Sequence, residues 1–153
     1  MKNNRFDSVI MMWISFALAI IAVLMMFVPV YKIEGQVYNA INGFFGSTTE
    51  NGSWPTFVGY MLILVGALLV GFLALPFFEP SYGAEKLLLI VASILELVGI
   101  ALVMCAVIWW CLLNGKAELI THKNYIPLAG AYITGGLSLL SIFSNFYAIK
   151  LDK

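Results

Sequence analysis

Long uncharged, apolar stretches alternate with short polar segments along the whole chain. Residues 8–31 and 51–78 carry no charged side chain, and residues 87–113 carry only Glu96. A transmembrane helix needs about 20 apolar residues, and stretches of this length exceed most buried helices of soluble proteins. The pattern predicts four transmembrane helices, near residues 9–30, 57–78, 87–113 and 126–149.

The segments between the predicted helices are short, except for an outer loop at 31–55. Short connections place consecutive helices antiparallel to one another. Within the outer loop, apolar residues flank Gly35 on both sides, as in a short β-hairpin. We therefore expect an all-α membrane protein, an antiparallel four-helix transmembrane bundle with a β-hairpin-like outer loop, forming a single transmembrane domain over residues 1–153.

Composition explains why these helices belong in lipid. Of the 153 residues, 62% are hydrophobic and 10% are charged, and the mean hydropathy is +0.98. A folded chain of this size has too little interior to hide so many apolar side chains from water. Because basic and acidic residues cancel, there is also no basic field to attract nucleic acid. The expected partner of the surface is the lipid bilayer.

The first apolar stretch follows Lys2 and Arg5, as the core of a cleavable signal peptide follows basic residues. Such cores run for about 7–15 residues before a small-residue cleavage site. The stretch in this chain is longer, and three further apolar stretches come after it. We expect it to be retained as a transmembrane helix.

The distribution of basic residues predicts the orientation. An even number of helices places both termini on one side, together with the connection at 79–86. That side carries Lys2, Arg5, Lys86, Lys150 and Lys153, and the other side carries Lys32, Lys116 and Lys123. Cytoplasmic segments carry the excess of Lys and Arg. We expect a multi-pass protein of the cell membrane with both termini in the cytoplasm.

Small side chains recur at helical spacing inside the predicted helices. In lipid, such residues let helix backbones approach closely, and this packing drives helix association. The positions expected to pack are Gly66, Ala67, Gly71, Gly99, Ala131 and Gly135. Glycine is frequent in all membrane helices, so ordinary packing is the simplest interpretation of these positions.

Glu96 is the charged residue within a predicted helix. It lies ten residues beyond Lys86, about 15 Å into a hydrocarbon core about 30 Å thick. Residues at the same depth on the other helices, or on the same helix face, complete a predicted intramembrane polar site of Glu96, Ser93, Ser15, Ser138, Ser141 and Asn145. Because burial penalises the charged form, we expect a protonated carboxyl group that donates to a serine oxygen.

Residues for other chemistry are sparse. The only histidine, His122, lies in an outer loop without metal-ligating neighbours, and Cys105 and Cys111 match no redox or metal spacing. The sequence contains no Ser, His and Asp set and no glycine-rich phosphate loop. We therefore expect no metal site, no cofactor and no catalytic residue.

The layout also carries a family resemblance. A short tail and one helix precede a larger outer loop with strand character and Trp54, and three closely spaced helices follow. This arrangement resembles the claudin-like tetraspan architecture, although the cysteine pair of that family's loop is missing. The run Phe27-Val28-Pro29-Val30-Tyr31 and the segment Asn42-Gly43-Phe44-Phe45-Gly46 are similar to the first loops of small uncharacterised bacterial four-span proteins. The resemblance implies a topology and no activity.

Two functions from different classes remain open. The leading hypothesis is a small non-catalytic membrane protein that contacts another membrane protein or itself through its helix faces and outer loop. Such a protein would serve as an accessory subunit, an immunity or resistance factor, or a self-associating module. The alternative is a proton- or cation-coupled transporter or channel centred on Glu96, since intramembrane acids often serve such pathways. An enzyme that acts on lipid comes third, because no nucleophile and base can be named.

Overall fold

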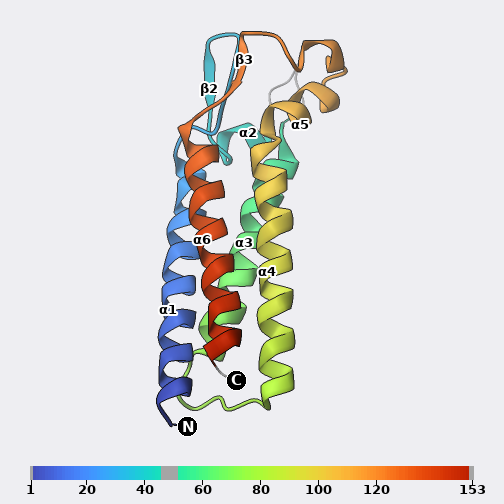
Figure 1. Ribbon diagram of the computed structural model, residues 1–153. Helices are drawn as coiled ribbons and strands as arrows, with labels where there is room; N and C mark the ends of the chain where they lie inside the picture. The colour runs from blue at the N-terminus through green and yellow to red at the C-terminus, as the bar shows by residue number, and fades with distance from the viewer. Residues whose placement is uncertain (1, 46–51, 152–153) are drawn as a thin grey trace.

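The computed structural model describes residues 2–45 and 52–151, so residues 46–51 of the predicted outer loop lie outside the described residues. Four long helices run side by side along one axis, and both termini lie at the same end (Figure 1). They are α1 (Lys2–Leu24), α3 (Trp54–Leu73), α4 (Tyr82–Met104) and α6 (Ala129–Leu151). By length and composition all four can cross a membrane. The fold is thus mostly helical, as the pattern of apolar stretches predicts.

The long helices form a closed ring in which each contacts its sequence neighbours. α3 packs between α1 and α4, and α6 packs between α4 and α1. The chain enters α3 through Pro55, which suits a first helical turn because proline lacks the N–H that would be unpaired there. α4 begins after Ser81, whose Oγ accepts a hydrogen bond from the Ala84 N–H at 3.4 Å.

The expected single helix at 87–113 is wrong, because the helix breaks at Cys105. α4 ends at Met104, and a separate helix α5 (Ala106–Leu113) follows. The Trp109 Nε1–H donates to the Leu102 carbonyl at 3.1 Å. In a continuous helix that carbonyl would accept from the backbone N–H of residue 106. An aromatic side chain therefore satisfies a backbone group near the break, which hydropathy alone cannot reveal.

Three short antiparallel strands cover the end of the bundle away from the termini (Figure 1). β1 (Tyr31–Ile33) pairs with β2 (Gln36–Tyr38) across a turn at Glu34 and Gly35, both of which have positive φ. This confirms the predicted hairpin. Glycine adopts such a conformation without a steric penalty, and Gly35 therefore allows a tight turn between strands of only three residues.

A third strand occupies residues expected to be helical. β3 (Tyr125–Pro127) pairs with the other edge of β1, with Tyr125 opposite Ile33 and Pro127 opposite Tyr31. The expected helix start at 126 is therefore wrong, and α6 begins at Ala129. Pro127 tolerates this place because it lies on an edge strand, where a missing N–H costs least.

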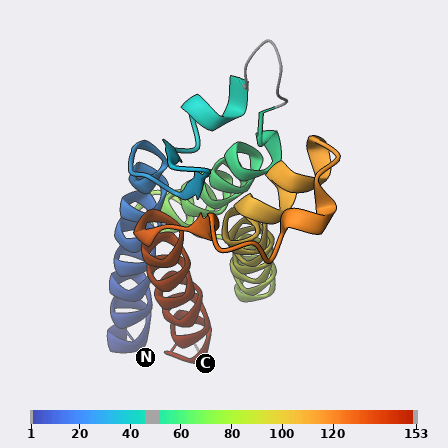
Figure 2. The ribbon, with the colours of Figure 1, turned by 90° about the horizontal axis from the view of Figure 1, so that it is seen from above.

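The sheet, α5, the short helix α2 (Asn42–Phe45) and the 3-10 turns η1 (Met25–Phe27) and η2 (Ala117–Leu119) form what we call the cap. Seen from above, α5 and the segment after it extend to one side of the bundle (Figure 2). One buried cluster joins cap and bundle, with Tyr31, Trp110 and Tyr125 from the cap and Tyr60 and Val103 from the long helices. The cap and the helices therefore share a core.

Candidate functional site

The buried face of α4 carries the two acidic residues of the helix interior. Glu85, Leu89, Ser93 and Glu96 are all buried, at the three- and four-residue spacing of one helix face. Glu96 has no exposed surface, and Glu85 is 2% exposed. Because all these side chains point into the ring of helices, α1, α3 and α6 supply their surroundings.

Glu96 belongs to a network of hydrogen bonds that joins three helices. Ser141 Oγ of α6 lies 3.2 Å from Glu96 Oε1, 2.8 Å from Ser15 Oγ of α1 and 3.0 Å from the Ser15 carbonyl oxygen. The Ser15 hydroxyl donates to Asn145 Oδ1 at 2.5 Å. Asn145 Nδ2 donates in turn to Ser93 Oγ at 3.2 Å, which brings the network back to α4. Five of the six residues of the predicted polar site therefore form one connected chain.

Ser138 is the sixth residue of the predicted site, and it does not join the chain. Its Oγ is fully buried and, within the part of the chain that the structure describes, has no hydrogen-bond partner. Glu96 Oε2 is in the same condition among the described residues. Buried polar atoms are nearly always hydrogen-bonded, so two atoms of this kind within one predicted site are unusual.

α6 supplies several of the polar groups because its interior face is a polar stripe. Thr134, Ser138, Ser141 and Asn145 are spaced by four, three and four residues, and all are fully buried. The stripe continues toward the cap, where Tyr60 Oη lies 2.8 Å from Thr134 Oγ1. The polar groups thus form a column along the axis of the bundle, with Glu96 at an intermediate height.

Glycines bring the α3 backbone against α4 at the height of Glu96. A Cβ atom at Gly66 would lie 2.9 Å from the Ala92 carbonyl oxygen and 2.9 Å from Glu96 Cγ. A Cβ atom at Gly99 would lie 2.6 Å from the Gly59 carbonyl oxygen. Both distances are shorter than real Cβ contacts, so only glycine permits this approach.

The other residues expected to pack also lie inside the ring. A Cβ at Gly71 would meet the Phe16 ring at 2.8 Å, and one at Gly135 would meet Met104 Sδ at 3.2 Å. Ala67 and Ala131 are fully buried. In the described part of the chain, all six positions contribute to packing within a single copy of the chain.

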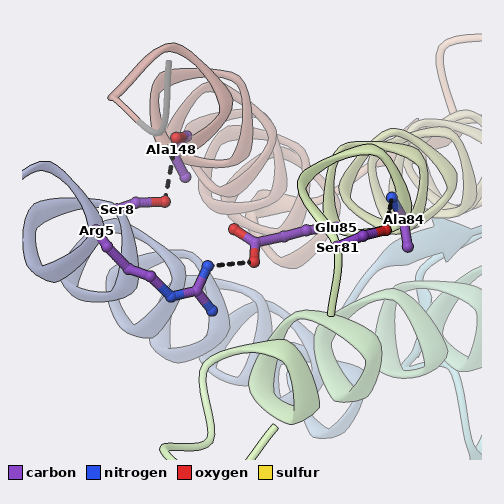
Figure 3. A network of polar contacts seen from close by, with 6 residues as sticks. All are labelled: Arg5, Ser8, Ser81, Ala84, Glu85 and Ala148. Carbon is purple, nitrogen blue, oxygen red and sulfur yellow. Dashed lines mark hydrogen bonds and ion pairs between the residues drawn. The ribbon is translucent and has the colours of Figure 1, made fainter. Parts of the chain in front are cut away.

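A second polar cluster lies at the end that carries the termini. Figure 3 shows Arg5 of α1 reaching Glu85 of α4, with Nη1 and Oε2 separated by 2.8 Å. Beside it, the Ser8 hydroxyl donates to the Ala148 carbonyl of α6 at 3.1 Å. The sequence prediction misses Glu85, because it places residues 79–86 in a connection between helices. Its spacing of eleven residues from Glu96, close to three full turns, was the available signal.

Histidine and cysteine make no site here. Among residues 2–45 and 52–151, no group of three or more His, Cys, Asp or Glu side chains is placed to hold a metal ion. Cys105 and Cys111 are both free thiols. The polar column is therefore the strongest candidate site in the described chain.

Comparison with known proteins adds no family. No protein-family model, no curated protein and no solved structure matches this chain. The claudin-like layout stays a prediction that rests on the order of helices and loops. Function is therefore argued from contacts and charges alone.

Proposed function

We propose that the chain is a small multi-pass protein of the cell membrane that acts without catalysis, by contacting another membrane protein or a second copy of itself. It would serve as an accessory subunit, an immunity or resistance factor, or a self-associating module. One observation carries the proposal. The six small residues expected to pack and the polar column of the long helices face inward, which leaves the charged surface of the cap and the apolar helix faces for partners.

The proposed orientation has both termini in the cytoplasm and the cap outside. The four helices are apolar enough to cross a membrane, and the two termini lie at one end of the bundle (Figure 1). In the proposed topology, five of the eight basic residues belong to that end of the bundle. An excess of basic residues is usual for cytoplasmic segments. Tags on the two termini should both report from the cytoplasm. Tags that report from opposite compartments would contradict this orientation.

The cap offers a polar surface on a rigid support. A cavity of about 460 Å³ at the end of the sheet is lined by Lys32, Glu34, Gly35, Lys123, Asn124 and Ile126. The carboxylate of Glu34 is held in place by the Tyr125 hydroxyl, which donates to Oε1 at 2.7 Å. Because Tyr125 also belongs to the shared core, the cavity is fixed relative to the bundle. A surface of this kind suits a partner with charged groups of both signs.

The helix faces offer an apolar surface. On α6, Tyr132, Leu140 and Phe143 are 56%, 53% and 67% exposed, and a Cβ atom at Gly136 would meet nothing within 4 Å. Lipid covers such a face in a membrane, and a partner helix can replace the lipid where small residues permit close approach.

Cross-linking in intact membranes, followed by purification and identification of the captured chains, tests the contact function. A Lys123→Glu variant should reduce capture through the cap. Lys150→Glu, which reverses one charge at the opposite end of the bundle, should leave capture unchanged and is the matched control. A protein that is strictly monomeric in membranes and captures no partner would refute the proposal.

A second candidate function is favoured by the polar column. Glu96 Oε2 and Ser138 Oγ are buried without a hydrogen-bond partner among the described residues, and intramembrane acids often serve proton or cation pathways. A proton- or cation-coupled transporter centred on Glu96 predicts that Glu96→Gln abolishes pH-dependent flux in liposomes while the helical fold is retained. Unchanged flux would eliminate this candidate.

A further inference from the structure

The hydrogen-bond chain at Glu96 contains a limited number of hydrogen atoms, and their positions can be assigned one by one, starting at Ser93. The Ser93 hydroxyl donates to the Leu89 carbonyl at 2.8 Å. Its one hydrogen is therefore used within α4, and Ser93 Oγ is an acceptor for Asn145 Nδ2. A serine has only one hydrogen to donate, so each assignment constrains the next residue in the chain.

The contact between Ser15 and Asn145 fixes the orientation of the amide. The two atoms lie 2.5 Å apart. Hydrogen bonds from O–H groups reach about 2.5 Å, whereas those from N–H groups are rarely shorter than about 2.7 Å. Asn145 therefore presents its oxygen to Ser15, and its nitrogen faces Ser93. The one hydrogen of the Ser15 hydroxyl lies on this contact.

The remaining contacts then require more hydrogens than the serines and the amide supply. Ser141 has one hydrogen to donate, and its Oγ lies 2.8 Å from Ser15 Oγ and 3.0 Å from the Ser15 carbonyl oxygen. With the Ser15 hydrogen already placed, these contacts with Ser15 use the hydrogen of Ser141. No serine hydrogen is left for the 3.2 Å contact between Ser141 Oγ and Glu96 Oε1. A hydrogen on the Glu96 carboxyl group completes the chain, with each hydroxyl donating to the next residue toward Asn145.

The surroundings of the second carboxyl oxygen also favour a protonated carboxyl group at Glu96. An ionised carboxylate would place part of its charge on Oε2, which has no partner in the described chain, and a buried charge without a donor is costly. From α1, α3 and α6, Ser141 contacts Glu96, Ser15 contacts Ser141, and Gly66 packs against the arm of Glu96, and none of these residues titrates. Titratable groups elsewhere in the described interior include the Arg5 and Glu85 pair, about three turns away along α4, Tyr60 toward the cap, and Cys111 of α5.

We propose that Glu96 is a proton-binding site and that its proton controls the contact between α1 and α6. When the proton leaves for a water molecule, the carboxylate accepts the hydrogen of Ser141. Ser15 then donates to Ser141, and Asn145 Oδ1 loses its donor. The proton is the ligand, rather than a metal ion, because divalent cations need about six oxygen ligands. The inference goes beyond the proposed contact function and does not depend on it.

Infrared spectroscopy of the purified protein in lipid nanodiscs tests whether the Glu96 carboxyl group carries a proton. At neutral pH, the wild-type protein should show the carbonyl stretch of a protonated carboxylic acid. Glu96→Gln should lose that band, and the exposed-site control Glu118→Gln should keep it. Labelling glutamate carboxyl carbons with ¹³C should shift the band in the wild-type protein, which assigns it without any variant. A wild-type spectrum without such a band, or a carboxylate band that shifts with the added monovalent or divalent cation, would overturn the proposal.

Hydrogen exchange tests the coupling to α1 and α6. Raising the pH until the acid band disappears should speed exchange around Ser15 and Asn145 in the wild-type protein. Glu96→Gln keeps a neutral donor at this position, so its exchange should show only the intrinsic pH dependence of amides and provides the correction. Equal pH dependence in the two proteins would overturn the coupling. Neither experiment depends on a partner, so their failure is distinguishable from failure of the contact function.

Discussion

Glu85 and Glu96 lie on the same buried face of α4, but they are stabilised in different ways. Glu85 lies in the first turn of the helix and pairs with Arg5, which remains 37% exposed. Glu96 lies about three turns deeper, and its described contacts are with a neutral hydroxyl and with closely packed glycine backbone. The first site compensates a charge with a charge, and the second compensates a carboxyl group with hydrogen bonds.

An apolar layer separates the two acids. Met12, Leu89, Ala92 and Ala148 are buried in one cluster between them, with exposures of at most 1%. A charge at the end of the bundle keeps access to water through Arg5, whereas a charge at Glu96 would be surrounded by this layer and by glycine backbone. The comparison teaches that position along one helix face decides whether an acid is held as an ion or as a neutral group.

The largest expected effect comes from removing the cation of the first site. Arg5→Ala removes the ion pair with the buried Glu85, and the free energy of unfolding in mixed micelles should fall by about 2–3 kcal/mol. This is less than the loss of about 3–5 kcal/mol that is usual for breaking a fully buried pair, because Arg5 is partly exposed. Adding Glu85→Gln should recover part of the loss. Arg5→Ala without measurable effect would mean that the ion pair does not hold α1 to α4.

The next largest effect is expected at the second site, where α3 packs against Glu96. Gly66→Ala places a methyl group against the Ala92 carbonyl and the arm of Glu96, and overpacking of this kind costs about 1–3 kcal/mol. Gly136→Ala is the matched control, since its Cβ would meet nothing within 4 Å, and we expect it to be neutral or slightly stabilising. Equal stabilities of the two variants in the same micelles would contradict the close approach of α3 to Glu96.

A smaller loss of stability is expected when the hydrogen bonds between α1 and α6 are removed. Ser15→Ala removes contacts with Ser141 and Asn145, and hydrogen bonds between membrane helices contribute about 0.6–1.7 kcal/mol. Ser144→Ala is the control, because its hydroxyl donates within its own helix, to the Leu140 carbonyl. A double-mutant cycle of Ser15→Ala with Asn145→Ala measures the coupling directly, and a coupling of zero would remove the link.

The smallest effect should come from Glu96→Gln. A glutamine keeps a neutral group with a donor for Ser141, so the unfolding free energy should change by less than about 1 kcal/mol. Thermal unfolding of both proteins should also agree at mildly acidic and neutral pH. A loss as large as that of Arg5→Ala would mean that Glu96 is held as an ion, and the distinction between the two acids would disappear.

Much of the polar chain could be anticipated because a bilayer gives antiparallel helices a common depth scale. Counting from the cytoplasmic end of each predicted helix selects Ser15, Ser138 and Ser141, and helical spacing adds Asn145. The structure joins Ser15, Ser141 and Asn145 to Glu96 and Ser93. The depth count could not show that Ser138 stays outside the hydrogen-bond chain, because that depends on the direction of its side chain. A function for this hydrogen-bond chain stays a prediction.

Sequence alone determined the four apolar helices and the turn at Gly35, because hydropathy and glycine geometry are local properties of the chain. Only the tertiary structure decided that Tyr125–Pro127 is a strand, that the third apolar stretch breaks at Cys105, and that Arg5 pairs with Glu85. The ion pair joins residues 80 positions apart, and β3 lies far along the chain from β1. Such pairings depend on which surfaces meet after the helices have packed, and no local pattern of residues encodes that.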